Sequence, residues 1–309
     1  MTDLTVFENI FKGPFPDTLF QKPEFFKLHA NSNVGYFELC RRDVVIASIH
    51  FTPTGANNTW RSPAKGTFAG LHFAPGSKYS DLVYFLEYVE ATLEARGARQ
   101  LEVILPPEAH SGTVFAQQFY LFRSLGFDIA QCDLNQSLDV DDRGLSERMT
   151  YGNLKRLRKC EREGFVASSL PLAELPSVYE TLEINRGSKG NALSMNLAQL
   201  KLMADTFPDK ILLFGCGLKN ELAASAVCLG VSPDVLYVFY WGDRPEYRSH
   251  SPVVMLANAI YQYAQIHAFK ILDVGTSTID RAPNIGLIDF KRGLGFSESL
   301  KVRMRKIYD

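Results

Sequence analysis

The segment LIDFKRGLGF, from Leu287 to Phe296, nearly repeats an earlier segment, FYLFRSLGF, which ends at Phe127. Both segments close on Arg-x-Leu-Gly-Phe. An apolar, helix-like run that closes on glycine predicts a helix C-terminus, because glycine readily adopts the left-handed conformation found there. The copies differ just before the shared arginine, where the first has Phe122 and the second has Lys291. This duplicated turn predicts two similar halves that differ in polarity at one equivalent position.

The same succession of strands surrounds this turn in each half. A hairpin is predicted at Val34 to Phe51 and again at Leu212 to Leu229, because two apolar runs meet at a charged turn in both. A third strand is expected next, at KGTFAGLHF (residues 65–73) in the first half and at VLYVFYWG (residues 235–242) in the second. Two hairpins with a further strand each predict a repeated sheet.

A helix and another strand follow in both halves. In the first half the helix is indicated by apolar residues at helical spacing, namely Leu82, Val83, Phe85, Leu86, Val89 and Leu93. In the second half Pro252 suits a helix's first turn, and the segment VVMLANAIYQYAQ after it is apolar nearly all round. The strands QLEVIL and KILDVG come next, and each half ends with the second helix, the turn and a last strand.

The element order β-β-β-α-β-α-β therefore occurs twice, with Phe122 and Lys291 169 residues apart. This order predicts an α/β (α+β) fold of two tandem modules, each a mixed, mostly antiparallel sheet flanked by helices. The acidic and polar segment DVDDRGLSERMT, residues 139–150, is the expected joint. The modules are accordingly expected at residues 1–143 and 144–309.

The composition is that of an ordinary globular protein, with 46% hydrophobic and 22% charged residues. A net charge of −1 provides no overall field that would attract nucleic acid or an anionic membrane. The five cysteines lack any C-x-x-C spacing and are expected to be reduced thiols, while the six histidines lack the spacing of metal ligands, so no metal is expected. No signal peptide or membrane-spanning run is apparent. We expect a cytoplasmic protein that does not insert into membranes, and its oligomeric state stays open.

Several short motifs resemble one family of transferases. Asn284, Leu287 and the Leu-Gly-Phe at 294–296 are similar to a motif of the Gcn5-related N-acetyltransferase fold. Two such modules in tandem resemble the Fem family of peptidoglycan aminoacyl transferases and the acetyltransferase-like proteins of polysaccharide gene clusters. Three further segments fit that group, YGNLKRLRKCEREGF, NRGSKG and DVG, which begin at Tyr151, Asn185 and Asp273.

The resemblance implies an activity and a division of labour. An acyl or aminoacyl group would move from a CoA thioester, or from an aminoacyl-tRNA, to an amine of a sugar, a peptide or a cell-wall precursor. Acyl-CoA would then be a co-substrate, and the acceptor would be a small molecule. Because Phe122 can neither donate a proton nor stabilise an oxyanion, the second module is expected to be active and the first to be non-catalytic.

The resemblance also locates the donor site. The donor would lie between two splayed strands, residues 235–241 and 270–275, and its phosphates would meet the loop RPEYRSHSPVV that starts at Arg244. This loop has Ser251 and Val253 where the family has small residues, mostly glycine, and Pro252 between them has no N–H.

Other donors near that loop can replace the missing backbone groups. Arg248, Ser249 and His250 are the expected substitutes, and Tyr240 on the preceding strand is expected to contribute to the donor pocket. Two alternatives stay open. Ser251 can simply cap a helix, and Tyr237, Tyr240 and Trp241 can simply belong to the core.

Lys291 and Asp273 are the expected catalytic residues. In the family pattern the position of Lys291 commonly holds a tyrosine that protonates the leaving thiolate, and a Fem-like lysine is linked to the transfer step. A lysine can stabilise an oxyanion or donate that proton, and Asp273 can orient the lysine or accept a proton from the attacking amine. The alternatives are that Lys291 extends from a helix end to water and that Asp273 caps a following turn.

Basic residues elsewhere are candidates for binding phosphate or the acceptor. Arg186 and Lys189 flank the glycines of NRGSKG in an expected loop, where backbone N–H groups and cations can meet an anion. Arg156 lies in a basic run that can contact tRNA or a nucleotide-linked phosphate, or can be a solvated helix face. A different class of function is also open, a non-catalytic ligand-binding or scaffold protein whose donor site is degenerate.

Overall fold

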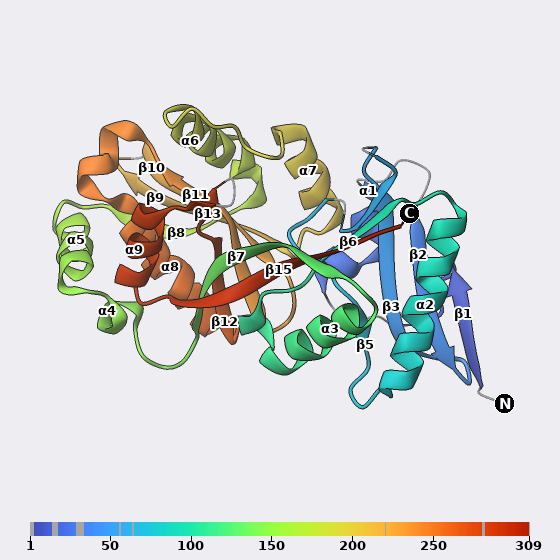
Figure 1. Cartoon of the computed structure of the whole chain (residues 1–309). Coiled ribbons are helices and arrows are strands. Elements are labelled where there is room, and N and C mark those ends of the chain that lie inside the picture. The colour runs from blue at the N-terminus through green and yellow to red at the C-terminus, as the bar shows by residue number, and fades with distance from the viewer. Residues whose placement is uncertain are drawn as a thin grey trace. The chain divides into compact units, whose positions relative to one another are not determined.

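The computed structural model describes residues 3–13, 18–28, 34–55, 57–63, 65–219, 221–279 and 282–308 (Figure 1). The chain forms two compact units. The first comprises Met1–Leu134 together with Ser299–Asp309, and the second comprises Asn135–Glu298.

The sheet of the first unit has the strand order β1-β2-β3-β4-β6-β15, and β5 pairs with β3. Its strands are β1 (Leu4–Glu8), β2 (Gly35–Arg41), β3 (Val44–Pro53), β4 (Thr59–Ser62), β5 (His72–Phe73), β6 (Gln100–Ile104) and β15 (Ser297–Ile307). Its helices are η1 (Leu19–Gln21), α1 (Pro23–Leu28), α2 (Tyr79–Ala95), η2 (Glu108–His110) and α3 (Gly112–Ser124). Neighbouring strands are antiparallel except β4 and β6, which are parallel.

The sheet of the second unit has the order β7-β12-β11-β10-β9-β8, in which only β11 and β12 are parallel. Its strands are β7 (Asp128–Asp139), β8 (Val166–Leu170), β9 (Ile211–Leu218), β10 (Glu221–Gly230), β11 (Val235–Asp243) and β12 (Ile271–Thr276). Of β7, only the part from Asn135 onward belongs to this unit. A separate ribbon pairs β13 (Thr278–Ile279) with β14 (Ala282–Pro283). Its helices are α4 (Leu145–Arg148), α5 (Tyr151–Arg162), η3 (Leu172–Glu174), α6 (Leu175–Gly187), α7 (Leu197–Thr206), η4 (Pro245–His250), α8 (Pro252–Ile266) and α9 (Ile285–Gly293).

The predicted fold class is confirmed, because both halves contain the hairpin, the third strand, the two helices and the last strand in the expected order. The position predicted for the third strand of the first half is wrong. That strand is β4, whereas the segment KGTFAGLHF forms a strand only at His72 and Phe73. Gly66 and Gly70 have positive φ angles of 96° and 73°, which interrupt an extended chain. The segment is largely apolar because residues 68–71 form a buried loop.

Part of the last strand of each sequence half belongs to the unit formed mainly by the other half: residues 135–139 of β7 and residues 299–307 of β15. In the first unit β15 pairs antiparallel with β6, with Arg303 opposite Ile104. In the second unit the end of β7 pairs antiparallel with β12, with Leu138 opposite Leu272. The compact units therefore divide at Leu134 and Glu298 and do not coincide with the expected modules of 1–143 and 144–309. A strand belongs to the sheet that satisfies its backbone hydrogen bonds, whatever its place in the repeat.

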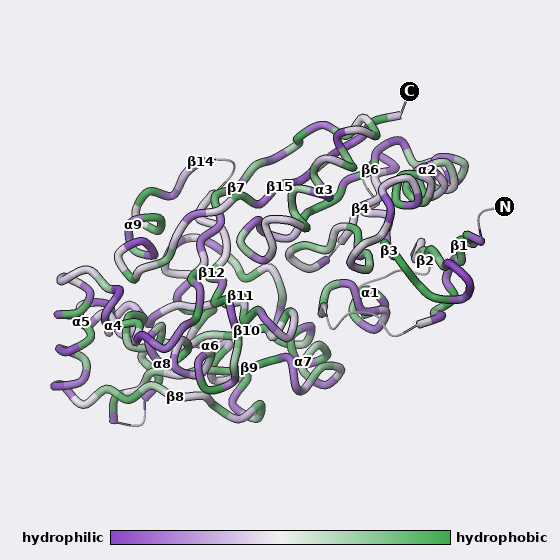
Figure 2. The backbone as a smooth tube through the Cα atoms, turned by 90° about the horizontal axis from the view of Figure 1, so that it is seen from below, coloured by the Kyte–Doolittle hydropathy of each residue, from purple (hydrophilic) through white to green (hydrophobic). Residues whose placement is uncertain are grey.

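Each unit has its own hydrophobic core. In the first, α2 packs Leu82, Phe85 and Leu86 against strand residues such as Phe37 and Ile49. In the second, α8 is buried on most sides, as its composition predicts. Figure 2 shows the contrast along the chain between hydrophobic strands such as β3 and the polar helix α5.

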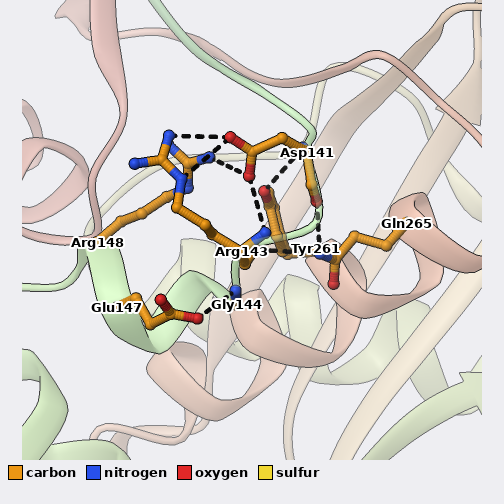
Figure 3. Close-up of polar contacts among 7 residues, drawn as sticks. All are labelled: Asp141, Arg143, Gly144, Glu147, Arg148, Tyr261 and Gln265. Carbon is orange, nitrogen blue, oxygen red and sulfur yellow. Dashed lines mark hydrogen bonds and ion pairs between the residues drawn. The ribbon is translucent and has the colours of Figure 1, made fainter.

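The expected joint is folded against α8 (Figure 3). Asp141 accepts hydrogen bonds from Arg143 and Arg148, and these two guanidinium groups hold the pKa of its carboxyl far below the usual range. The Gln265 side chain of α8 donates to the backbone oxygens of Asp141 and Arg143 at 2.6 and 3.0 Å. Arg148 also contacts the second Leu-Gly-Phe turn. A Cβ added at Gly295 would lie 2.7 Å from the Arg148 Cβ.

Candidate active site

Two parallel strands of the second unit separate after a short pairing. β11 and β12 pair at Val235–Ile271, Leu236–Leu272 and Tyr237–Asp273, and β11 continues beyond this pairing to Asp243. Gly275 bends β12 with a φ of 73°, and a Cβ there would lie 3.2 Å from the Tyr237 hydroxyl oxygen. The backbone pairing between the two strands therefore ends at Tyr237 and Asp273.

A pocket of about 490 Å³ lies where β11, α6, α8 and α9 come together. Its lining residues are Asn185, Arg186, Lys189, Asn191, Trp241, Gly242, Asp243, Arg248, Ser251, Val253, Asn284, Gly286, Leu287 and Phe290. Trp241 and Phe290 form an aromatic side of this pocket, with ring centroids 6.0 Å apart. The Asn284 side chain caps α9 by accepting from the Leu287 N–H at 3.2 Å.

The pocket is positively charged, because three of its lining residues are cations (Arg186, Lys189 and Arg248) and one is an acid (Asp243). The Arg248 Nε lies 3.6 Å from the Asp243 carboxylate. The pKa of Lys189 is lowered, mainly by burial and further by the two arginines, whereas Asp243 opposes the shift. An excess of cations in a concave site favours a phosphate or carboxylate ligand.

A buried asparagine fixes the acid of the pocket. The Asn185 amide nitrogen donates to the Asp243 backbone oxygen at 2.7 Å and to its Oδ1 at 2.8 Å, while the Asn185 oxygen accepts from the Lys189 ammonium at 3.1 Å. Gly242 makes this possible, since a Cβ there would lie 2.5 Å from the Asn185 Cγ. Asn185 and Arg186 end helix α6, so the expected loop at NRGSKG begins only at Ser188.

The loop before α8 keeps a backbone conformation that glycine favours. Ser251 has φ 58° and ψ 49°, in the left-handed region, and its side chain makes no capping hydrogen bond. Ser251 therefore stands at the N-cap position of α8, as the simpler alternative expected, but its side chain makes no capping hydrogen bond. A left-handed residue turns the chain sharply into the helix, and Ser251 lines the pocket at this turn.

Lys291 is buried, with only 1% of its surface exposed. Its ammonium donates to the backbone oxygens of Gly275 at 2.9 Å and Thr276 at 3.1 Å, at the bend of β12. Burial lowers the pKa of Lys291 to about 7, although the nearby Asp273 carboxylate raises it. The alternative in which Lys291 extends from the helix end to water is therefore wrong.

Asp273 lies beneath the same bend and is fully buried. Its Oδ1 accepts from the Gly275 N–H at 2.7 Å and from the Asn135 amide at 3.1 Å. Next to Asn135, the buried Gln136 accepts from the Ser277 hydroxyl at 2.7 Å and donates to the Ile288 backbone oxygen at 3.2 Å. A polar core thus holds the end of β12 against α9.

Of the remaining candidates, Ser249 and His250 face helix α5 and do not line the pocket. The Ser249 backbone oxygen accepts from the Lys159 ammonium at 3.3 Å. The His250 ring lies 2.6 Å from a Glu163 carboxylate oxygen, and this contact lowers the pKa of Glu163.

Tyr240 and Arg156 also lie outside the pocket lining. The Tyr240 hydroxyl contacts the Ser194 hydroxyl and accepts from the Met195 N–H at 3.2 Å, and burial raises its pKa. Arg156 is on the exposed face of α5 and donates to the Asn153 side chain at 2.7 Å. The pocket therefore brings together four candidates, Arg186, Lys189, Arg248 and Ser251.

Sequence reasoning missed four polar residues, Asn135, Gln136, Asn185 and Asp243. Asn135 and Gln136 stand in a strand, where two adjacent buried amides are unusual, and this was the available signal. Asn185 and Asp243 carried no local signal, because their contact joins residues 58 apart.

No described helix has the length and apolar character needed to cross a membrane. The described histidine, cysteine and acidic side chains form no group of three or more that could hold a metal ion.

No protein-family model and no curated protein matches the sequence. Solved structures do match. FemX aligns with a TM-score of 0.73 at 14% identity, over 94% of this chain and 92% of that chain. The C-terminal domain of a putative lysylphosphatidylglycerol synthetase from Agrobacterium fabrum aligns with a TM-score of 0.56 at 10% identity, over 84% and 81%. A tandem GNAT protein from the clavulanic acid biosynthesis pathway aligns with a TM-score of 0.53 at 13% identity, over 92% and 86%.

At identities this low, the structural matches show that the folds are alike and do not specify a reaction or a substrate. The match to FemX covers nearly the whole of both chains, so it includes both halves of the repeat. The chain has a Fem-like tandem acetyltransferase fold.

Proposed function

We propose that this protein is a transferase that moves an acyl or aminoacyl group onto an amine, and that the second unit holds the donor. The observation that carries the proposal is the cationic pocket beside the separated strands β11 and β12. A CoA thioester and an aminoacyl-tRNA both carry phosphate. In the CoA thioester it lies at the far end of the pantetheine arm from the acyl group, and in the aminoacyl-tRNA it lies beside the ribose that bears the aminoacyl group. Arg186, Lys189 and Arg248 would bind that phosphate and replace the N–H groups that Pro252 cannot supply.

In the proposed reaction the acceptor amine attacks the carbonyl carbon of the donor and forms a C–N bond. The bond to the leaving sulfur or oxygen then breaks, the amine loses a proton, and the leaving group takes one up. Lys291 would donate this proton as an ammonium, and Asp273 would orient it. Near neutral pH a group with a pKa of about 7 can both give up and regain a proton.

The acceptor would be an amine of a sugar, a peptide or a cell-wall precursor. If the donor is a tRNA, the basic face of α5, including Arg156, offers a surface for its backbone.

A second candidate function is a ligand-binding protein without transfer activity. Pro252 at the first position of α8 favours it, because a phosphate at this helix start would meet fewer backbone N–H groups than a glycine-rich loop provides. Both candidates require the pocket to bind a donor, and only the first requires turnover.

Calorimetric titration with CoA and with an aminoacylated RNA minihelix tests the binding step. At 100 times its Kd, a ligand that binds only the folded state adds about 2.7 kcal/mol to the stability, so thermal unfolding gives a second readout. Arg248→Met should weaken binding about tenfold, which corresponds to about 1.4 kcal/mol. Arg156→Met, outside the pocket, is the matched control for CoA and should leave its affinity unchanged.

The proposal fails if neither ligand binds the wild-type protein, or if Arg156→Met and Arg248→Met weaken CoA binding equally. Binding without transfer to any amine, under single-turnover conditions, would favour the ligand-binding protein.

A further inference from the structure

We propose that Asp243 makes the pocket selective for a ribonucleotide, by accepting a hydrogen bond from a ribose hydroxyl next to the bound phosphate. The inference rests on the proposed function, in which this pocket receives the phosphate of the donor. It goes further by naming the residue that distinguishes a nucleotide from a bare anion.

The Asp243 carboxylate has one oxygen available to a ligand. Its Oδ1 accepts from Asn185 at 2.8 Å and lies 3.6 Å from the Arg248 Nε. Within the described part of the chain, no hydrogen bond is made to its Oδ2, since the bond from Asn185 is to Oδ1. The side chain is 13% exposed and lines the pocket, so a ligand in the pocket can reach it.

The carboxylate is fixed before any ligand arrives. Asn185 is 1% exposed and holds both the backbone oxygen and Oδ1 of Asp243. Any side chain at position 242 would collide with Asn185, because even a Cβ would lie 2.5 Å from the Asn185 Cγ. The residue is therefore held in one orientation by a buried amide and a glycine, which is how a recognition group is preorganised.

An acid in an anion pocket lowers the affinity for a bare anion, because like charges repel. A ligand that donates a hydrogen bond to the free carboxylate oxygen recovers the affinity that this repulsion removes. An aspartate that accepts from a ribose hydroxyl beside a bound phosphate is a known arrangement in nucleotide sites of other folds. Trp241 and Phe290 on the same pocket offer an aromatic surface for the base.

The test compares ADP, 2′,3′-dideoxy-ADP and sulfate by calorimetric titration, since sulfate carries no proton at neutral pH. The wild-type protein should bind ADP about 10- to 100-fold more tightly than dideoxy-ADP, the range expected for a hydrogen bond to a charged group. In Asp243→Asn the amide oxygen keeps its bond to Asn185, so the NH₂ group replaces the free acceptor. This variant should lose the preference for ADP and bind sulfate more tightly than the wild type does.

Two results would overturn the inference. Equal binding of ADP and dideoxy-ADP by the wild type would exclude hydroxyl recognition. Equal tightening of ADP, dideoxy-ADP and sulfate in Asp243→Asn would show that Asp243 acts only as a counter-ion. Either result leaves CoA or minihelix binding, and hence the proposed function, intact, whereas the absence of all donor binding removes both.

Discussion

The two Leu-Gly-Phe turns are closed by equivalent backbone hydrogen bonds, but the side chain at one equivalent position is apolar in the first turn and cationic in the second. In the first, the Phe127 N–H donates to the Phe122 oxygen at 3.0 Å, and in the second the Phe296 N–H donates to the Lys291 oxygen at 3.2 Å. Phe122 and Lys291 are each 1% exposed, so both side chains point into the protein. Equivalent buried positions thus hold an aromatic ring in one unit and an ammonium in the other.

The two turns differ in what their buried side chain contacts. Phe122 lies in the first core and packs edge-on against Phe127, with ring centroids 5.1 Å apart. Lys291 instead binds the carbonyl oxygens at the bend of β12, and its lowered pKa means that burial disfavours the charged form. Stability alone would favour an apolar residue there. A buried cation of this kind supports the role proposed above for Lys291 in the transfer step.

Replacing Phe122 of the first turn by the lysine of the second should have the largest effect on stability. Phe122→Lys places an ammonium in a hydrophobic core, so it should lower the free energy of unfolding by about 4 kcal/mol or more. Phe122→Leu, which keeps an apolar side chain, should lower it by about 1 kcal/mol. Urea denaturation at pH 7 measures both. Similar losses for the two variants would mean that the first turn can accommodate a charge, and the contrast between the turns would disappear.

Replacing the glycine of each turn by alanine should lower the stability by different amounts, and this difference should be smaller than that between the two Phe122 variants. Gly126 and Gly295 have φ angles of 85° and 101°, so alanine is strained at both. An added Cβ meets only the Lys306 Cε at 3.8 Å in the first turn, whereas in the second it meets the Arg148 Cβ at 2.7 Å and its backbone oxygen at 3.2 Å. Gly126→Ala should cost about 1 kcal/mol of stability and Gly295→Ala about 3 kcal/mol. Equal costs in urea denaturation would contradict the tight contact at Arg148.

Local patterns predicted much of this molecule. The hairpins, the helices and both turns follow from periodicity and from glycine at a helix end, so their order could be predicted from sequence. The pairing of β15 and of the end of β7 with strands of the other half could not be predicted, because either strand would fit the pattern of either sheet. Residues 65–73 were misassigned because a buried loop is as apolar as a strand.

Within the candidate site, the sequence predicted only those residues that stand at positions of a short sequence motif. Lys291, Asp273 and Arg248 stand at motif positions, and the structure places Lys291 and Asp273 at one bend and Arg248 in the pocket. Asn185 and Asn135 act through tertiary contacts, to Asp243 and to Asp273, which no local pattern specifies. Ser249 and His250 follow the same loop as Arg248 but turn to α5, because Lys159 and Glu163 of that region bind them.

The most direct test of the role of Lys291 is the single-turnover rate of acyl transfer in the wild type and in Lys291→Met, with the donor identified by titration. Methionine keeps most of the length of the side chain and removes the charge. We expect the rate to fall about 10²- to 10³-fold, with donor affinity unchanged, because a group that acts in the transition state is lost. The wild-type rate should fall as the pH rises through about 7, where the ammonium loses its proton, and the variant should lack this dependence. A folded variant that transfers at the wild-type rate would contradict a role for Lys291 in the reaction.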